Sequence, residues 1–328
     1  LTWSGADVGG FFGDPDAELM TRWYQLGAFY PFFRGHAHLD TKRREPWAFG
    51  EPHTGHIRDA IRRRYALMPY LYALFEKAHR SPLEKGTPVL RPLWYEFPDD
   101  DAIASADDVA MLGPALLVAP VLAKGAATRE TYLPAGTWYD YDTGEAFVGP
   151  VTVTKRVTVS DAPLYVRGGF IVPRRDRARR SVAAAAGDAL TLLVAPDADG
   201  FATGEAYFDD GVGYDFVEGE GHDAPNAPNT ASFMRRRFTF DDGVLACGAS
   251  KSTGSDAVPK ERNFPDAATR VERVVLLGAD AGTYASEAEV RVFSQTDSLS
   301  ERTFAVDVER APTSERGGEA GALAARAP

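Results

Sequence analysis

One stretch decides the fold of the first part of the chain: residues 4–47, SGADVGGFFGDPDAELMTRWYQLGAFYPFFRGHAHLDTKRREPW. Two short apolar runs in or beside it, Trp3 to Val8 and Phe29 to Arg34, are typical of buried strands, and a helix-length segment separates them. Asp7 lies at the end of the first run, and His36 follows the second. Reacting groups in barrel and doubly wound α/β folds sit at the carboxyl ends of parallel strands, so we expect Asp7 and His36 to face one pocket.

Two helices are expected around these runs. Asp14 and Pro15 have the composition of an N-cap followed by a first helical residue, and the helix they begin should run to about Ala28. A longer helix should follow, because apolar residues recur at spacings of three and four between Ile57 and Phe75. Pro69 should kink this second helix. The order strand, helix, strand, helix gives two βα units, which is a quarter of an eight-fold barrel.

From about Pro88 the pattern changes to short β-rich runs separated by turn residues, which is typical of antiparallel sandwiches. The basic segment RRDRARR, residues 174–180, divides these runs into two groups, and we interpret its charges as a solvated face or as linker charges. We therefore predict an α/β part followed by an all-β part, with a surface loop at 219–230. The predicted divisions are 1–85 for the βα units, 86–175 for a proximal β-sandwich, 176–310 for a distal β-sandwich and 311–328 for a disordered tail.

The composition limits the classes of partner. The chain has 328 residues with 36 Lys and Arg against 47 Asp and Glu, a net charge of −11. This charge argues against nucleic acid or an anionic membrane as the main partner. No apolar run approaches the ~20 residues of a membrane span. The one cysteine, Cys247, excludes an internal disulfide and a cysteine-rich metal site.

Asp7 and the two phenylalanines that follow it each allow two interpretations. The two oxygens of the Asp7 carboxylate suit the vicinal hydroxyls of a sugar, but an acid at a strand end can equally cap a neighbouring helix. Phe11 and Phe12 come directly after two glycines and could present a ring to the apolar face of a sugar. Packing of both rings in the core is the alternative.

His36, His38 and Asp40 alternate with a period of two, so on a strand all three would point the same way. Such an arrangement can bind a metal ion, but the other histidines do not lie on further strands that could complete the site. We therefore expect no metal and no cofactor, and we favour His36 as a donor to a sugar hydroxyl, with His38 allowed a structural role. Glu45 and Asp59 lie among arginines, so ion pairing is the natural interpretation of both.

Several segments together resemble glycoside hydrolase family 31. They are SGADVGGFFG, RWYQLGAFYPFFRGHAH, RREPW, RRYALMPYLYALFEKAH, PVLRPLWYEFP, LGPALLVAPV, YLPAGTWYDY, RGGFIVPRR, YFDDG, MRRRFTF and ERVVLLGA. The resemblance covers roughly residues 3–280 and implies a (β/α)8 TIM barrel entered at its seventh strand. Residues 1–85 would then hold its last two βα units, followed by two antiparallel β-sandwich domains. The resemblance also places Asp7 on the sugar-binding aspartate of the family, Phe11 on an aromatic of the pocket and His36 on the histidine of a P-F-x-R-x-H motif.

The resemblance implies a retaining α-glucosidase that acts without a metal. The two catalytic aspartates of the family lie on earlier strands of the barrel, so we expect no catalytic residue here and no turnover by this chain alone. Within the family the segments are most similar to the α-glucosidases that trim N-glycans in the lumen of the endoplasmic reticulum. This implies an oligosaccharide or N-glycan substrate and a non-catalytic β-subunit as partner. An α-xylosidase and a non-catalytic carbohydrate-binding or subunit-docking module remain as alternatives.

Overall fold

The computed structural model describes residues 3–80, 86–209, 211, 233–249 and 270–278, together with the strands at 287–293, 301–310 and 323–326. The surface loop predicted at 219–230 lies outside these residues, and so does most of the predicted tail. Residues 323–326 differ from the expected disorder, because they form a strand that pairs with two others in a sheet. No helix in the described parts of the chain is long and apolar enough to span a bilayer.

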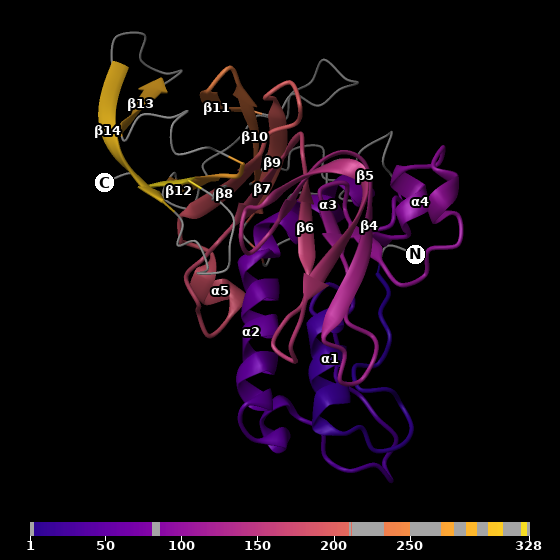
Figure 1. Cartoon of the computed structure of the whole chain (residues 1–328). Helices are drawn as coiled ribbons and strands as arrows, with labels where there is room; N and C mark the ends of the chain where they lie inside the picture. The colour runs from indigo at the N-terminus through magenta and orange to yellow at the C-terminus, as the bar shows by residue number, and fades with distance from the viewer. Residues whose placement is uncertain are drawn as a thin grey trace, which may run out of the picture.

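The helices and 3-10 turns are α1 (Ala17–Gly27), η1 (Pro46–Phe49), α2 (His53–Ala66), α3 (Met68–Arg80), α4 (Leu93–Glu96), η2 (Asp101–Ile103) and α5 (Val182–Ala185). Helices α1 and α2 lie side by side in the lower part of the view, and α3 lies at the level of the strands (Figure 1). The prediction of Asp14 as the first N-cap was wrong. Asp16 caps α1 instead, since its Oδ1 accepts a hydrogen bond from Leu19 N at 2.8 Å, whereas Asp14 accepts from Lys42 N at 2.8 Å.

The second predicted helix is interrupted close to Pro69, as expected. Two helices, α2 and α3, replace the single kinked one, and Leu67 between them leaves the helical conformation with φ −80° and ψ 2°. Pro69 has no N–H to donate to the carbonyl four residues earlier, so the hydrogen-bond pattern of one continuous helix cannot pass through it.

The two apolar runs expected as strands lie beside each other and run parallel. Among the described residues they are joined by a single isolated β-bridge, between Val8 and Gly35. Val8 N donates to Arg34 O at 2.9 Å, and Phe32 N donates to Ser4 O at 2.9 Å. These bonds are too widely spaced to make a regular ladder. The prediction of two regular strands was therefore wrong, although their predicted neighbourhood is confirmed.

Two sheets make up the β part. The six-stranded sheet has the order β1-β2-β3-β6-β4-β5, with β1 Leu90–Arg91, β2 Ala110–Leu112, β3 Leu116–Val118, β4 Thr128–Asp140, β5 Ala146–Arg156 and β6 Leu164–Arg167. The nine-stranded sheet has the order β11-β10-β9-β7-β8-β12-β15-β14-β13. Its strands are β7 Phe170–Arg174, β8 Leu190–Ala195, β9 Ala202–Asp209, β10 Phe233–Asp241, β11 Val244–Ala249, β12 Val271–Leu276, β13 Glu287–Phe293, β14 Glu301–Arg310 and β15 Leu323–Arg326.

The second sheet differs from the expectation in two ways. Strand β7 belongs to it although the predicted domain boundary lay at residue 175, because Gly168 and Gly169 turn the chain from β6 into the other sheet. Gly169 adopts a φ of +91°, which favours glycine. The sheet is also not purely antiparallel, since β7 pairs with β9 and β8 pairs with β12 in parallel.

One core joins the helices to both sheets. Leu67 and Leu71 at the junction of α2 and α3 pack in the same buried cluster as Leu116 of the first sheet and Leu193 of the second. The hydroxyl of Tyr70 donates to a carbonyl of the first sheet, Leu112 O, at 2.8 Å. The α/β part is thus anchored on the β part through buried contacts, which fixes the position of the loops at its far end.

Four of the five arginines in residues 174–180 have an acidic or carbonyl partner, so the interpretation as linker charges was wrong, but the side chains of Arg177 and Arg179 stay 55% and 43% exposed, as expected of a solvated face. Arg177 pairs with Glu272 on β12, and Arg179 pairs with Asp188 at 2.7 Å. Arg175 donates to Asp188 O at 3.0 Å. The hydrogen bond from Arg179 lowers the pKa of the Asp188 carboxyl below its ordinary value. These bonds tie the segment to the second sheet.

Candidate functional site

An ion pair joins the two parallel segments at the carboxyl end of the first. Arg34 approaches Asp7 through Nη2 at 2.7 Å and Nε at 3.2 Å, and both atoms contact the same oxygen, Oδ1. The Asp7 side chain is 22% exposed and the Arg34 side chain 48%. Asp7 therefore does not cap a helix. Its second oxygen, Oδ2, has no partner in the described parts of the chain, so it can still accept a hydrogen bond.

Aromatic and histidine rings follow this pair along the two segments. The Phe11 ring centroid is 5.6 Å from that of His36 and 5.9 Å from that of His38, while Phe12 lies 5.5 Å from His38. Phe12 is 75% exposed and Phe11 is partly exposed, so core packing of these two rings was the wrong alternative. The structure brings Phe11 and His36 into contact, and places Asp7 one residue before the bridge that joins their segments.

The loop that carries Phe11, residues 9–13, is held by a buried guanidinium. Arg44 donates to the carbonyl oxygens of Gly9 at 3.1 Å, Gly10 at 2.5 Å and Gly13 at 2.6 Å. The backbone amide of His38 donates to Phe11 O at 2.8 Å. The Phe11 loop is therefore tied to the segment that follows His36.

The alternating residues after Arg34 do not form a strand. His38 Nδ1 lies 3.3 Å from Asp40 Oδ2, and the His38 side chain is partly exposed while that of Asp40 is largely exposed. Across the described residues, no three His, Cys, Asp or Glu side chains group closely enough to hold a metal ion. The geometry therefore offers no support for the metal interpretation of His36, His38 and Asp40.

The sequence reasoning missed two residues of this site, Arg34 and Arg44. Arg34 belongs to the P-F-x-R-x-H motif and ends the second apolar run. A basic residue at the end of a segment expected to lie beside the one that carries Asp7 was the signal that could have identified it. Arg44 lies in the RREPW segment, but nothing in that segment indicated its partners, since only folding brings its side chain to carbonyl groups more than thirty residues away. Glu45 pairs with Arg43 at 2.5 Å, as expected.

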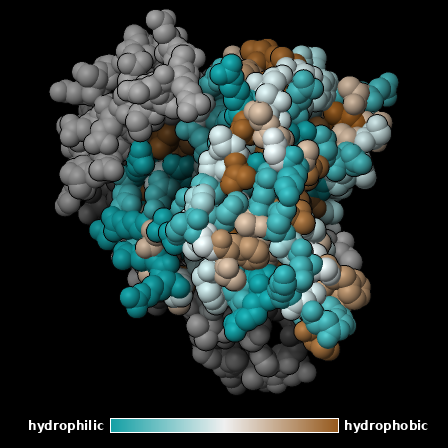
Figure 2. Space-filling view, turned by 60° about the horizontal axis from the view of Figure 1, so that its bottom comes forward, coloured by the Kyte–Doolittle hydropathy of each residue, from teal (hydrophilic) through white to brown (hydrophobic). Residues whose placement is uncertain are grey.

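Exposed apolar side chains gather on the segments of this site. They are Phe11, Phe12, Leu39 and Trp47. Figure 2 brings forward the end of the molecule where α1 and α2 lie, and it shows brown apolar patches separated by teal polar surface. Apolar surface of this kind, beside charged and hydrogen-bonding groups, suits a ligand with both polar edges and apolar faces.

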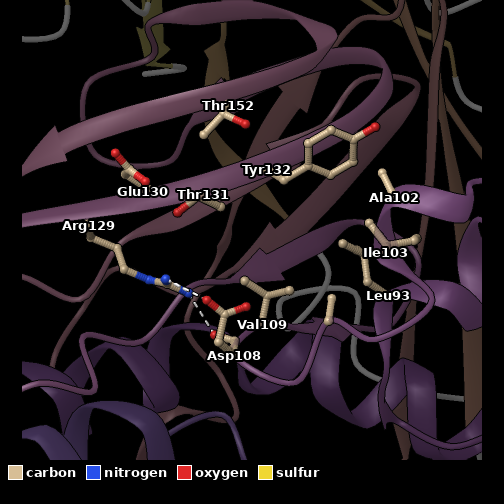
Figure 3. Close-up of a pocket in the computed structure, with 11 residues that line it drawn as sticks. Leu93, Ala102, Ile103, Asp108, Val109, Arg129, Glu130, Thr131, Tyr132 and Thr152 are labelled. Atoms are coloured by element: carbon tan, nitrogen blue, oxygen red, sulfur yellow. Dashed lines mark hydrogen bonds and ion pairs between the residues drawn. The ribbon is translucent and has the colours of Figure 1, made fainter.

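A cavity of ≈ 340 Å³ lies elsewhere, between the segment of α4 and η2 and the strands β4 and β5 (Figure 3). Its principal charged groups satisfy each other, because Arg129 donates to both Asp108 Oδ2 and Asp108 O at 2.7 Å. The Tyr132 hydroxyl donates to Asp100 Oδ2 at 2.9 Å. This cavity shares no lining residue with the site around Asp7, and its Arg129, Asp108 and Tyr132 side chains already have partners.

Two family models match the chain. The glycosyl hydrolases family 31 TIM-barrel domain matches residues 1–74, and the glycosyl hydrolase family 31 C-terminal domain matches residues 86–172. The chain belongs to glycoside hydrolase family 31. The predicted family and the coarse fold, a TIM-barrel part followed by antiparallel sheets, are thereby confirmed.

Relatives of known name agree with this assignment. The chain is 44% identical over 283 residues to a probable glucan 1,3-alpha-glucosidase of Arabidopsis thaliana, covering 86% of this chain and 28% of the relative. It is 42% identical to neutral alpha-glucosidase AB of Homo sapiens, covering 85% of this chain and 27% of the relative. Among solved structures, a glucosidase II alpha subunit bound to Glc1Man2 superimposes with a TM-score of 0.83 at 35% identity, covering 98% of this chain and 33% of that one. The chain thus spans about a third or less of each of these relatives.

Proposed function

We propose that this chain works as the carboxyl-terminal part of a retaining α-glucosidase that removes terminal α-linked glucose from oligosaccharides. The observation that carries the proposal is the Asp7–Arg34 pair beside the rings of Phe11 and His36, in a chain of this family. The term "full-length enzyme" denotes a protein that contains these residues together with the remaining part of the barrel. Residues 1–85 would then supply the part of the pocket that holds the sugar.

Each residue has a chemically suitable task in this proposal. Asp7 Oδ2 accepts a hydrogen bond from a glucose hydroxyl, and such charge-assisted bonds are roughly twice as strong as neutral ones. Arg34 occupies the other oxygen and so fixes the direction of the free one. His36 donates from its ring to a neighbouring hydroxyl, while Phe11 covers the apolar face of the sugar. None of these four residues breaks the glycosidic bond.

Bond cleavage needs groups that we assign to the preceding part of the barrel. A retaining mechanism uses two carboxyl groups about 5 Å apart, one as nucleophile and one as general acid and base. In the proposal both belong to earlier strands, so these 328 residues alone have no turnover. No metal or cofactor takes part.

The names of similar structures support a narrower proposal. They include a glucosidase II alpha subunit with Glc1Man2 and a heterodimeric complex of endoplasmic-reticulum glucosidase II with the binding domain of its regulatory subunit. We infer an N-glycan substrate, a site in the lumen of the endoplasmic reticulum and a glucosidase II β-subunit as partner. An α-xylosidase also has this fold, with 28% identity and a TM-score of 0.64, so activity on α-xylosides is the principal competitor.

The test compares the full-length enzyme with the 328-residue chain on nitrophenyl α-glucoside and α-xyloside. We expect the full-length enzyme to release nitrophenol from the glucoside with the higher kcat/KM, and the chain alone to match a mock preparation. A preference for the xyloside would contradict the α-glucosidase assignment. Glycan binding by a chain without turnover, together with an inactive full-length protein, would instead favour a non-catalytic module.

A further inference from the structure

We propose that Arg44 is a positioning residue that holds the Phe11 loop, residues 9–13, in the conformation that binds glucose. The inference rests on the proposed function of the same site. Arg44 does not reach the sugar in this proposal. It acts through the backbone of the loop, and so determines where the Phe11 ring lies relative to His36.

The guanidinium of Arg44 gathers three carbonyl groups of one short loop. Its Nη1 contacts Gly9 O and Gly10 O, and its Nη2 contacts Gly13 O at 2.6 Å. Arg44 is only 7% exposed, so water cannot readily replace it as a donor. Gly9 is buried as well, and a buried carbonyl group without a donor is costly, which makes the loop conformation dependent on this side chain.

The glycines of the loop are adapted to this arrangement. Gly9, Gly10 and Gly13 have φ values of +96°, +76° and +73°, which turn their carbonyl groups inward. A Cβ on Gly9 would lie 2.7 Å from Met20 Sδ and 3.3 Å from Arg44 Nη1. The backbone therefore closes around the guanidinium, with no room for a side chain at Gly9.

The same contacts connect the two halves of the sugar site. Arg44 and the backbone amide of His38, which donates to Phe11 O, both belong to the segment after His36. Four carbonyl groups of the five-residue loop are thus bound by that segment. Because the loop carries Phe11, these bonds set the 5.6 Å separation between the Phe11 and His36 rings.

A second arginine provides a matched control. Arg64 donates to three main-chain carbonyl groups between α1 and the second extended segment, Ala28 O at 2.9 Å, Tyr30 O at 2.6 Å and Pro31 O at 3.2 Å. The chemistry of the two arginines is the same, but Arg64 does not contact the Phe11 loop. Loss of either should reduce stability, and only loss of Arg44 should alter the sugar site specifically.

The experiment compares Arg44→Ala, Arg44→Lys and Arg64→Ala in the full-length enzyme. Loss of bonds from a charged donor changes an equilibrium by roughly tenfold or more. We therefore expect Arg44→Ala to raise the inhibition constant of glucose about tenfold, with a larger change in KM than in kcat. Arg44→Lys, which keeps a cationic donor, should recover part of this loss. Arg64→Ala should leave the glucose constant within about twofold of wild type.

A second measurement does not depend on activity. Chymotrypsin cleaves after phenylalanine, and the cleavage at Phe11 and Phe12 can be followed by mass spectrometry. Arg44→Ala and Arg44→Lys should be cut there faster than wild type and Arg64→Ala. Equal cleavage in all four proteins, or equal glucose constants for the two alanine variants, would overturn the positioning role. If the wild-type enzyme is inactive but the Arg44 variants are still cleaved faster, Arg44 does hold the Phe11 loop, and the α-glucosidase assignment is wrong.

Discussion

Arg34 holds Asp7 by a single carboxylate oxygen, with Nη2 at 2.7 Å and Nε at 3.2 Å from Oδ1. The pair is partly exposed, so its own contribution to stability is small. The ion pair instead determines which oxygen of Asp7 is free. With Oδ1 occupied, Oδ2 is the atom through which Asp7 can accept a hydroxyl of the substrate.

This relationship predicts coupled effects on catalysis. In the full-length enzyme, Asp7→Asn should lower kcat/KM by about ten- to a hundredfold, because a charged acceptor becomes neutral. Arg34→Ala should cause a smaller loss in the same direction. The kcat/KM of the double variant should be little lower than that of Asp7→Asn alone, since both changes disrupt the same interacting pair. Fully additive losses in steady-state kinetics would show that the two side chains act independently.

The N-cap of α1 predicts a pH-dependent contribution to stability. Asp16→Ala should lower the free energy of unfolding by about 1 kcal/mol, whereas Asp16→Asn should retain most of the cap. The hydrogen bond from Leu19 N, followed by that from Lys124, holds the pKa of Asp16 below its ordinary value of 3.8. Its charged form therefore stabilises the fold above that value, and this contribution disappears as the pH falls through the lowered pKa.

Urea unfolding at pH 7 and below pH 4 checks this prediction. The difference between wild type and Asp16→Asn should shrink at the lower pH. Asp59→Ala, which removes an exposed pair with Arg62 on α2, is the control and should change stability by less than about 0.5 kcal/mol at either pH. A difference that grows on acidification would contradict the role of the Asp16 charge.

Tyr70 predicts a stability effect at the junction of helices and sheets. Its hydroxyl donates to Leu112 O at 2.8 Å and accepts from Ala115 N at 3.2 Å. Burial raises the pKa of Tyr70 well above its ordinary value, so the hydroxyl stays protonated. Tyr70→Phe should lower the free energy of unfolding by about 1–3 kcal/mol, because two buried main-chain groups lose their partner. The half-exposed Tyr95 provides the control: thermal unfolding of Tyr95→Phe should match wild type, and equal losses for both variants would refute the explanation.

A chelator tests the metal interpretation of His36, His38 and Asp40. Because the described residues offer no group of three metal-binding side chains, incubation of the full-length enzyme with EDTA should leave its rate unchanged. A rate that falls with EDTA and returns with zinc would require a metal site.

Some features of this fold follow from local sequence, and others depend on distant contacts. Pro69 interrupts its helix because the missing N–H is a local property, and the residues around Asp7 and His36 could be placed together because parallel segments share an end. The choice of Asp16 over Asp14 depended on Lys42, which occupies Asp14 from another part of the chain. The turn of β7 into the second sheet and the convergence of three carbonyl groups on Arg44 also follow from tertiary packing, so no local pattern predicted them.

If residues of this chain hold the sugar, loss of the His36 ring must weaken the binding of glucose. Competitive inhibition by glucose should be measured for the full-length enzyme, for His36→Ala and for His56→Ala, a control on α2 for which no contact with Asp7, Phe11 or His36 is seen among the described residues. We expect His36→Ala to raise the inhibition constant about tenfold, the value of one lost hydrogen bond to a ligand, while His56→Ala leaves it unchanged. A His36→Ala enzyme with the wild-type constant would show that His36 does not hold the sugar.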